Sequence, residues 1–231
     1  MDELDDVLNE PLAVGDLDEL AAAVEWEAEQ AQKTPEKRRS AGQETGIGHD
    51  QRLVTRTAGR RAYDLRGVPN AVRLVRPLPV PGETVHAIMG GDFHAWDLVP
   101  AIVELAACPF AELWIATLGF NLGNNGHLCR LIDQGRIQRA TILCSDYFAK
   151  SDLSVFTESK AALEARGCRL VSSRNHAKVI LLAPAGRKDR YVVEGSANLR
   201  SCNNLEQFAL SNDRRLFDFH RSWIHQITNT C

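Results

Sequence analysis

Residues 174–184 read RNHAKVILLAP, and residues 191–198 read YVVEGSAN. Each stretch contains a short run rich in Val, Ile, Leu or Tyr, which is typical of a buried β-strand. A hydrophilic turn, Ala185–Arg190, separates the two runs. We therefore expect two paired strands, His176–Leu182 and Tyr191–Glu194, in which alternate side chains point to opposite faces.

Outward from this pair, the sequence alternates between strand and helix patterns. The expected strands are Val85–Met89, Leu113–Leu118, Ala140–Cys144 and Arg169–Ser172, and the expected helices are Trp96–Ala107, His127–Gln134, Ser154–Arg166 and one within Asn204–Ile227. This order predicts an α/β fold with a mixed sheet flanked by helices. Ligands of such sheets lie beyond the carboxyl ends of strands, which points to loops 90–94, 120–126 and 145–150.

The two paired runs carry side chains that suit a phosphodiester. His176 and Lys178 are two residues apart and share a face of their strand. The same spacing relates Glu194, Ser196 and Asn198. A neutral imidazole is a nucleophile, whereas a lysine and an amide stabilise charge that builds on the non-bridging oxygens. Glu206 is placed to hold the far nitrogen of His176 and fix its tautomer.

The motifs His176-Ala177-Lys178 and Gly195-Ser196-Ala197-Asn198, with a later Glu206, resemble the signature of the phospholipase D superfamily. The resemblance extends over the order of elements from about residue 84 to 227. It implies an α/β/α sandwich and metal-independent chemistry through a phosphohistidine, with no cofactor. The catalytic residues expected are His176, Lys178, Asn198 and Glu206, and the substrate contacts expected are Ser196, Asn175, His94 and Asp92.

Two departures from the family pattern affect these expectations. The family's aspartate falls five residues after the lysine, where this chain has Ala183. The chain also has a single HxK motif, which is similar to a bacterial endonuclease branch whose members act as homodimers. We therefore expect a homodimer with one composite site, because in-line attack needs a nucleophile and an acid on opposite sides of phosphorus. His94 is the alternative acid within one chain.

Charge is distributed unevenly along the chain. Residues 1–31 contain eleven Asp and Glu and no Lys or Arg, so subtracting this −11 from the net −3 leaves +8 for residues 32–231. A net positive charge over residues 32–231 suits binding of a polyanion, and nucleic acid is the expected substrate. The predicted organisation is an acidic, disordered tail and linker over 1–50, an arginine-rich arm over 51–83 and a catalytic domain over 84–231.

Several other classes are disfavoured by the sequence. No apolar run is long enough to span a bilayer, and the acidic N-terminus does not resemble a secretory signal. Six cysteines without a CxxC pair indicate reduced thiols and a cytoplasmic protein. No HExxH motif or paired CxxC predicts a metal site, and Ser196 lacks the GxSxG context of a serine hydrolase.

Two alternative functions stay open at this point. The first is a catalytically weak or inactive scaffold that binds nucleic acid or protein, which Ala183 and the acidic tail favour. The second is a phospholipid phosphodiesterase, which the lack of an evident membrane-binding surface disfavours, so no stable membrane association is expected.

Overall fold

The computed structural model describes residues 51–54, 67–89, 94–199 and 205–230, with only the backbone for 51–54. The acidic tail and linker predicted for 1–50, and the substrate contact predicted for Asp92, lie outside the described residues. Within the described part of the chain, no helix has the length and apolar character needed to cross a membrane.

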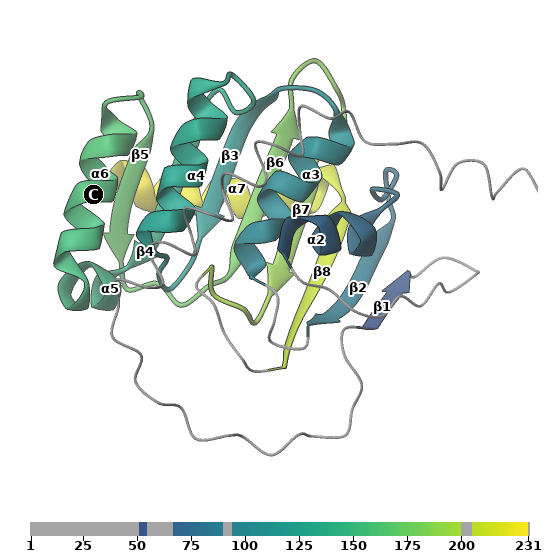
Figure 1. Cartoon of the computed structure of the whole chain (residues 1–231), viewed down its shortest axis with the longest axis horizontal. Coiled ribbons are helices and arrows are strands. Elements are labelled where there is room, and N and C mark those ends of the chain that lie inside the picture. The colour runs from purple at the N-terminus through teal and green to yellow at the C-terminus, as the bar shows by residue number, and fades with distance from the viewer. Residues whose placement is uncertain (1–50, 55–66, 90–93, 200–204, 231) are drawn as a thin grey trace, which may run out of the picture. The chain divides into compact units, whose positions relative to one another are not determined.

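Within these residues, an eight-stranded mixed sheet forms the centre of the fold (Figure 1). Its strands lie in the order β1-β2-β8-β7-β6-β3-β4-β5. Their bounds are β1 Gln51–Val54, β2 Thr84–Met89, β3 Phe110–Ala116, β4 Ala140–Ser145, β5 Arg169–Ser173, β6 Val179–Pro184, β7 Tyr191–Gly195 and β8 Glu206–Asn212. The pairs β3–β4 and β4–β5 are parallel, and all other neighbouring strands pair antiparallel.

Helices cover both faces of this sheet (Figure 1). One face carries α2 Gly67–Val75, α3 Leu98–Ala106, α4 Leu122–Asp133 and α6 Leu153–Glu164. The opposite face carries α7 Arg214–Thr230. Two short helices, η2 Ala95–Asp97 and α5 Asp146–Ser151, follow the ends of β2 and β4. The predicted fold class, an α/β/α sandwich around a mixed sheet, is therefore confirmed.

The hydrophobic core is divided into two by the alternation of side chains along the strands. In β6, Ile180 and Leu182 pack in the cluster beneath α2, α3, α4 and α6, whereas Val179, Leu181 and Ala183 pack in the cluster beneath α7. A strand that is buried on both faces is apolar at every position, and all six residues of β6 are buried. This explains why residues 179–184 form a continuous apolar run.

The structure also differs from the predicted elements at particular places. Glu206–Asn212 forms β8, a strand that the sequence analysis did not predict, and it joins β2 to β7. The loop predicted at 120–126 is mostly helix, because Asn121 caps α4: its Oδ1 accepts a hydrogen bond from the Asn124 backbone N–H at 2.8 Å. Strand β6 begins at Val179, so the HxK motif precedes it rather than lying within it.

Part of the predicted arginine-rich arm packs on the domain. Helix α2 buries Ala71, Leu74 and Val75 in the same hydrophobic cluster to which α3 contributes. Arg73 is exposed and donates a hydrogen bond to the Asn70 amide oxygen at 2.8 Å. Within the arm, α2 is thus an amphipathic helix that keeps Arg73 at the surface.

Candidate active site

The HxK and GSxN motifs meet at one edge of the sheet. Strands β2, β3, β4 and β7 end at this edge, and β6 and β8 begin there. A hollow at the edge is lined by residues from several of these strands and from α3, including Met89, Leu98, Thr117, Lys178, Gly195 and Phe208. Among the described residues that line it, Lys178 is the only charged one.

His176 and Lys178 contact each other directly. The lysine Nζ lies 2.9 Å from the His176 Nδ1 and donates a hydrogen bond to the His176 carbonyl oxygen at 2.9 Å. The intervening Ala177 packs against the α7 cluster, so the two motif side chains point away from α7. The shared face predicted from their spacing is the arrangement that brings the imidazole to the ammonium.

Burial and a nearby charge shift the pKa of Lys178 in opposite directions. Partial burial lowers the pKa of Lys178 from its ordinary value of 10.5, and the nearby negative charge of Glu206 opposes that shift. While the ammonium donates to Nδ1, the proton of a neutral His176 ring is on Nε2. Nε2 has a free lone pair only in the other tautomer, in which Nδ1 carries the proton and does not accept from the lysine.

Glu206 pairs with Ser196 in this structure. The Ser196 hydroxyl donates to the Glu206 carboxylate and accepts from the Gln207 backbone N–H at 3.0 Å. No hydrogen bond joins Glu206 to His176 among the described contacts, in contrast to the predicted role. The negative charge of Glu206 is close enough to Lys178 to oppose the lowering of the lysine pKa.

Gly195 allows β8 to approach the GSxN turn. A Cβ atom at this position would lie 2.6 Å from the Gln207 carbonyl oxygen, closer than any non-bonded contact allows. The Ser196 backbone N–H donates to that same oxygen at 3.0 Å. The glycine of the motif is therefore required by the close pairing of β7 with β8, which fixes Ser196 beside Glu206.

Asn175 was predicted to contact substrate, but its amide is used to hold the backbone. Its Nδ2 donates to the carbonyl oxygens of Thr117 at 3.0 Å and Leu143 at 3.1 Å. Its Oδ1 accepts from the Ala177 N–H at 2.9 Å. These three bonds fasten the HxK segment to the ends of β3 and β4, so in this structure Asn175 positions the two motif side chains.

Asn198 and His94 belong to segments that flank the His176–Lys178 pair at this sheet edge. Asn198 lines a neighbouring hollow, and its Oδ1 is buried with no hydrogen-bond partner among the described residues. His94 follows β2 at the same sheet edge and is half-buried, and its backbone N–H donates to Asp97 Oδ2 at 3.2 Å. Neither residue has a described contact with His176.

Glu194 lies on the opposite face from Lys178, although the sequence placed it with Ser196 and Asn198. It is the cross-strand partner of Val179, whose side chain packs beneath α7. Its Oε1 lies 3.0 Å from Nε2 of the buried His220, and the Trp223 indole donates to His220 Nδ1 at 3.0 Å. The sequence analysis did not predict this series of hydrogen bonds, because only the docking of α7 brings His220 to β7.

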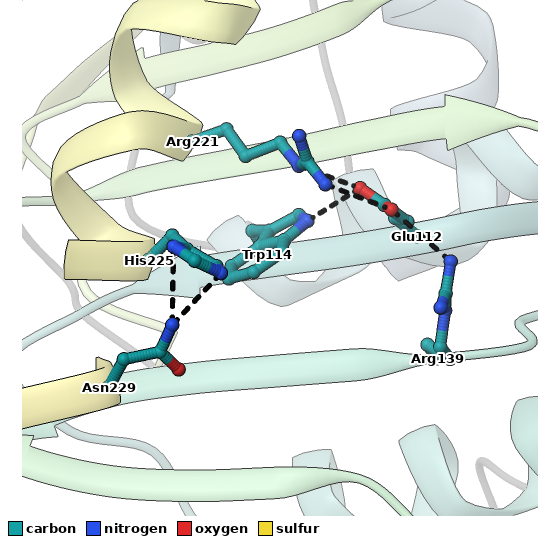
Figure 2. Close-up of polar contacts among 6 residues, drawn as sticks. All are labelled: Glu112, Trp114, Arg139, Arg221, His225 and Asn229. Atoms are coloured by element: carbon teal, nitrogen blue, oxygen red, sulfur yellow. Dashed lines mark hydrogen bonds and ion pairs between the residues drawn. The ribbon is translucent and has the colours of Figure 1, made fainter. Parts of the chain in front are cut away.

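The Ala183 position has an acidic cross-strand neighbour. Glu112 of β3 is the partner of Ala183, and paired residues of antiparallel strands share a face. Figure 2 shows Glu112 between two arginines: Arg221 Nε lies 2.9 Å from Oε2, and Arg139 Nη2 lies 3.3 Å from Oε1. The Trp114 indole also donates to Oε2 at 3.0 Å. A carboxylate therefore lies on this face, supplied by β3 instead of β6.

The described residues contain no group of three or more His, Cys, Asp or Glu side chains arranged to hold a metal ion.

Comparison with known proteins gives a limited result. Neither a protein-family profile nor a curated protein sequence matches the chain. Among solved structures, the chain is similar to polyphosphate kinase from Porphyromonas gingivalis, with a TM-score of 0.43 and 15% identity over 63% of this chain and 26% of that one. It is also similar to phosphatidylserine synthase from Haemophilus influenzae Rd KW20, with a TM-score of 0.43 and 12% identity over 74% of this chain and 42% of that one. The chain thus spans less than half the length of either protein.

Proposed function

We propose that this chain is a metal-independent phosphodiesterase, and specifically a nuclease, that acts through a phosphohistidine on His176. The observation that carries the proposal is the direct His176–Lys178 contact at the sheet edge, with the imidazole exposed and the ammonium in a hollow. An exposed nucleophile beside a partly buried cation is the pair that attack on a phosphodiester anion needs.

In the proposed first step, the phosphate oxygens attract the Lys178 ammonium away from His176 Nδ1. The freed ring takes the tautomer with Nε2 unprotonated, and Nε2 attacks phosphorus in line with the leaving oxygen. The P–N bond forms as the P–O bond breaks, and an acid protonates the departing alkoxide. Binding of the substrate itself thereby releases the nucleophile from the lysine.

In the second step, water attacks the phosphohistidine. The base formed when the acid gave up its proton now takes a proton from this water. The P–N bond breaks, and the products are a phosphate monoester and free His176. We propose that the acid is His176 of a second copy in a homodimer, since the chain has one HxK motif. His94, at the same sheet edge, is the alternative within one chain.

A binding module on an inactive scaffold is the competing proposal. It is favoured by one specific observation: Glu206 hydrogen bonds to Ser196, which leaves His176 without a carboxylate that fixes its tautomer. The two proposals differ in whether His176 turns over substrate.

The test uses the full chain against single-stranded DNA, duplex DNA, RNA and phospholipid, each with excess EDTA. We expect cleavage of nucleic acid that persists in EDTA and falls by about three powers of ten or more in His176→Ala. His225→Ala is the matched control, because His225 is exposed on α7 and should leave the rate unchanged. Binding of nucleic acid by folded chain without any turnover would favour the scaffold proposal instead.

The composite site has its own test. His176→Ala chains are mixed with wild type at increasing ratio and allowed to exchange subunits. One site shared by two copies predicts a rate that falls roughly as the square of the wild-type fraction. A linear decline, or full activity of a monomer at assay concentration, would reject the homodimer proposal and turn attention to His94.

A further inference from the structure

A second hollow lies beside the GSxN motif and has no role in the chemistry described above. It is lined by residues from three segments that meet at the sheet edge: Leu118, Gly119, Tyr147, Phe148, Ser151, Asp152 and Asn198. These segments follow β3, β4 and β7 respectively. The hollow therefore belongs to the same edge as His176 and Lys178.

Tyr147 stands out among the residues of this hollow. Its relative exposure is 71%, the largest among the exposed large hydrophobic residues of the described part of the chain. The next residue, Phe148, has a relative exposure of 2%, and its ring packs on Phe120 at 4.8 Å between centroids and on Phe156 at 6.5 Å. Phe148 thus serves the core, whereas the ring of Tyr147 is left at the surface.

The two hollows are interleaved along the chain. Thr117 lines the hollow that contains Lys178, and Leu118 and Gly119 line the second one. In the same way, Ala197 and Leu199 line the first, and Asn198 lines the second. The two hollows are therefore neighbours that share these two segments as walls.

The chemistry of the second hollow does not suit another phosphate. Asp152 brings a carboxylate, which repels an anion. Its Oδ2 accepts from the Ser151 hydroxyl at 3.2 Å, and a carboxylate has lone pairs for a further hydrogen bond from an amino or imino group. Leu118 and Phe148 supply apolar surface, and the Asn198 Oδ1 is a buried acceptor with no described partner. A flat group with an aromatic face and N–H donors at its edge fits these features.

Resting on the proposed function, we propose that this hollow takes an unpaired nucleobase next to the scissile phosphate, with Tyr147 as its stacking surface. A base in a duplex has both faces covered by its neighbours, so only a single strand or a frayed end can offer one. A phospholipid headgroup has no such ring. The inference makes single-stranded nucleic acid the preferred substrate.

The test measures binding in a His176→Ala background, so that it does not depend on turnover. The ligands are a 12-nucleotide single strand, the same strand made abasic throughout, and the same sequence as a duplex. We expect Tyr147→Ala to weaken binding of the intact single strand about tenfold and to leave the abasic strand unchanged. Tyr147→Phe keeps the ring and should bind nearly as the parent does.

Phe219→Ala is the matched control, since Phe219 has a relative exposure of 64% but lies on α7. It should change none of the affinities, and thermal melting should show that each variant is folded. Equal loss for intact and abasic strands, no loss at all, or no binding of any strand would overturn the subsite. Cleavage with no effect of Tyr147 would reject the subsite alone, and base-dependent binding without cleavage would reject the nuclease alone.

Discussion

Two histidines close to the β6–β7 hairpin have opposite environments. His176 is exposed at the sheet edge, and its described side-chain contact is the Lys178 ammonium. His220 lies on the α7 side with a relative exposure of 8%, between the carboxylate of Glu194 and the indole of Trp223. Because the Trp223 indole donates to Nδ1, the neutral His220 ring carries its proton on Nε2. This N–H donates a hydrogen bond to the Glu194 carboxylate.

The comparison teaches which histidine is chemically available. Both ring nitrogens of His220 have protein partners, so this ring is committed to holding α7 on β7. Among the described residues, the ring of His176 has one side-chain partner, the Lys178 ammonium, and a bound phosphate would compete for that ammonium. Glu112 on the α7 side is likewise paired, with Arg139 and Arg221. We infer that the edge at His176 serves reaction and the α7 face serves stability.

The largest expected effect is that of Lys178→Met on activity. The substitution keeps the side-chain length but removes the cation, so turnover should fall by about two powers of ten or more. Stability at pH 7 should not fall, because burial disfavours the charged form of this lysine. Rates and urea unfolding of the two chains measure both effects, and a large loss of stability would contradict the division between edge and face.

The same variant has a pH signature. The pKa of Lys178 is lower in the folded chain than its ordinary value of 10.5, so the unfolded chain binds more protons in the interval between the two. Stability contributed by this group therefore rises with pH across that alkaline interval. Lys178→Met should lack this part of the rise in urea unfolding at alkaline pH.

On the α7 face, Ala183→Asp tests whether this position tolerates a second carboxylate opposite Glu112. Ala183 is buried and directly opposite Glu112, so a new carboxylate would sit beside a like charge away from water. We expect a loss of about 3–5 kcal/mol in unfolding free energy and no gain in activity. Combining it with Glu112→Gln should cost less than the sum of the two changes, as a double-mutant cycle would show. Increased turnover would mean that a carboxylate at position 183 contributes to the reaction.

A smaller effect is expected when the hydrogen bonds of His220 to Glu194 and Trp223 are removed. His220→Ala leaves the Trp223 indole and the Glu194 carboxylate without their partner and opens a small cavity, which should cost about 2–3 kcal/mol. Turnover per folded molecule should stay close to wild type. Urea unfolding gives the first quantity and active-site-normalised rates give the second. Loss of turnover with unchanged stability would show that His220 belongs to the reaction.

The smallest effect should come from Arg139→Ala. The Arg139 side chain is 72% exposed where it meets Glu112, so the pair is screened by solvent and should contribute less than about 1 kcal/mol. The difference between the two chains should shrink further in 1 M salt. A loss comparable to that of His220→Ala would show that the cluster in Figure 2 depends on both of its arginines.

The sequence allowed most of the fold to be predicted. Short apolar runs and amphipathic stretches correctly indicated an alternating α/β order, and the spacing of His176 and Lys178 correctly indicated a shared face. Strand β8 escaped prediction because its seven residues, EQFALSN, mix polar and apolar side chains. It is stabilised by pairing with both β2 and β7, which are far from it in sequence.

What the sequence determined by itself is local: the two motifs, the common side of the chain on which His176 and Lys178 lie, and the type of fold that alternating strands and helices produce. The tertiary structure decided the partners. In the folded chain, Glu206 accepts a hydrogen bond from Ser196, and Glu194 contacts His220. Asn175 holds the HxK segment against β3 and β4 through hydrogen bonds to two backbone carbonyls. The physical reason is that periodicity is set within a few residues, whereas strand register and the docking of α7 depend on packing between segments distant in the chain.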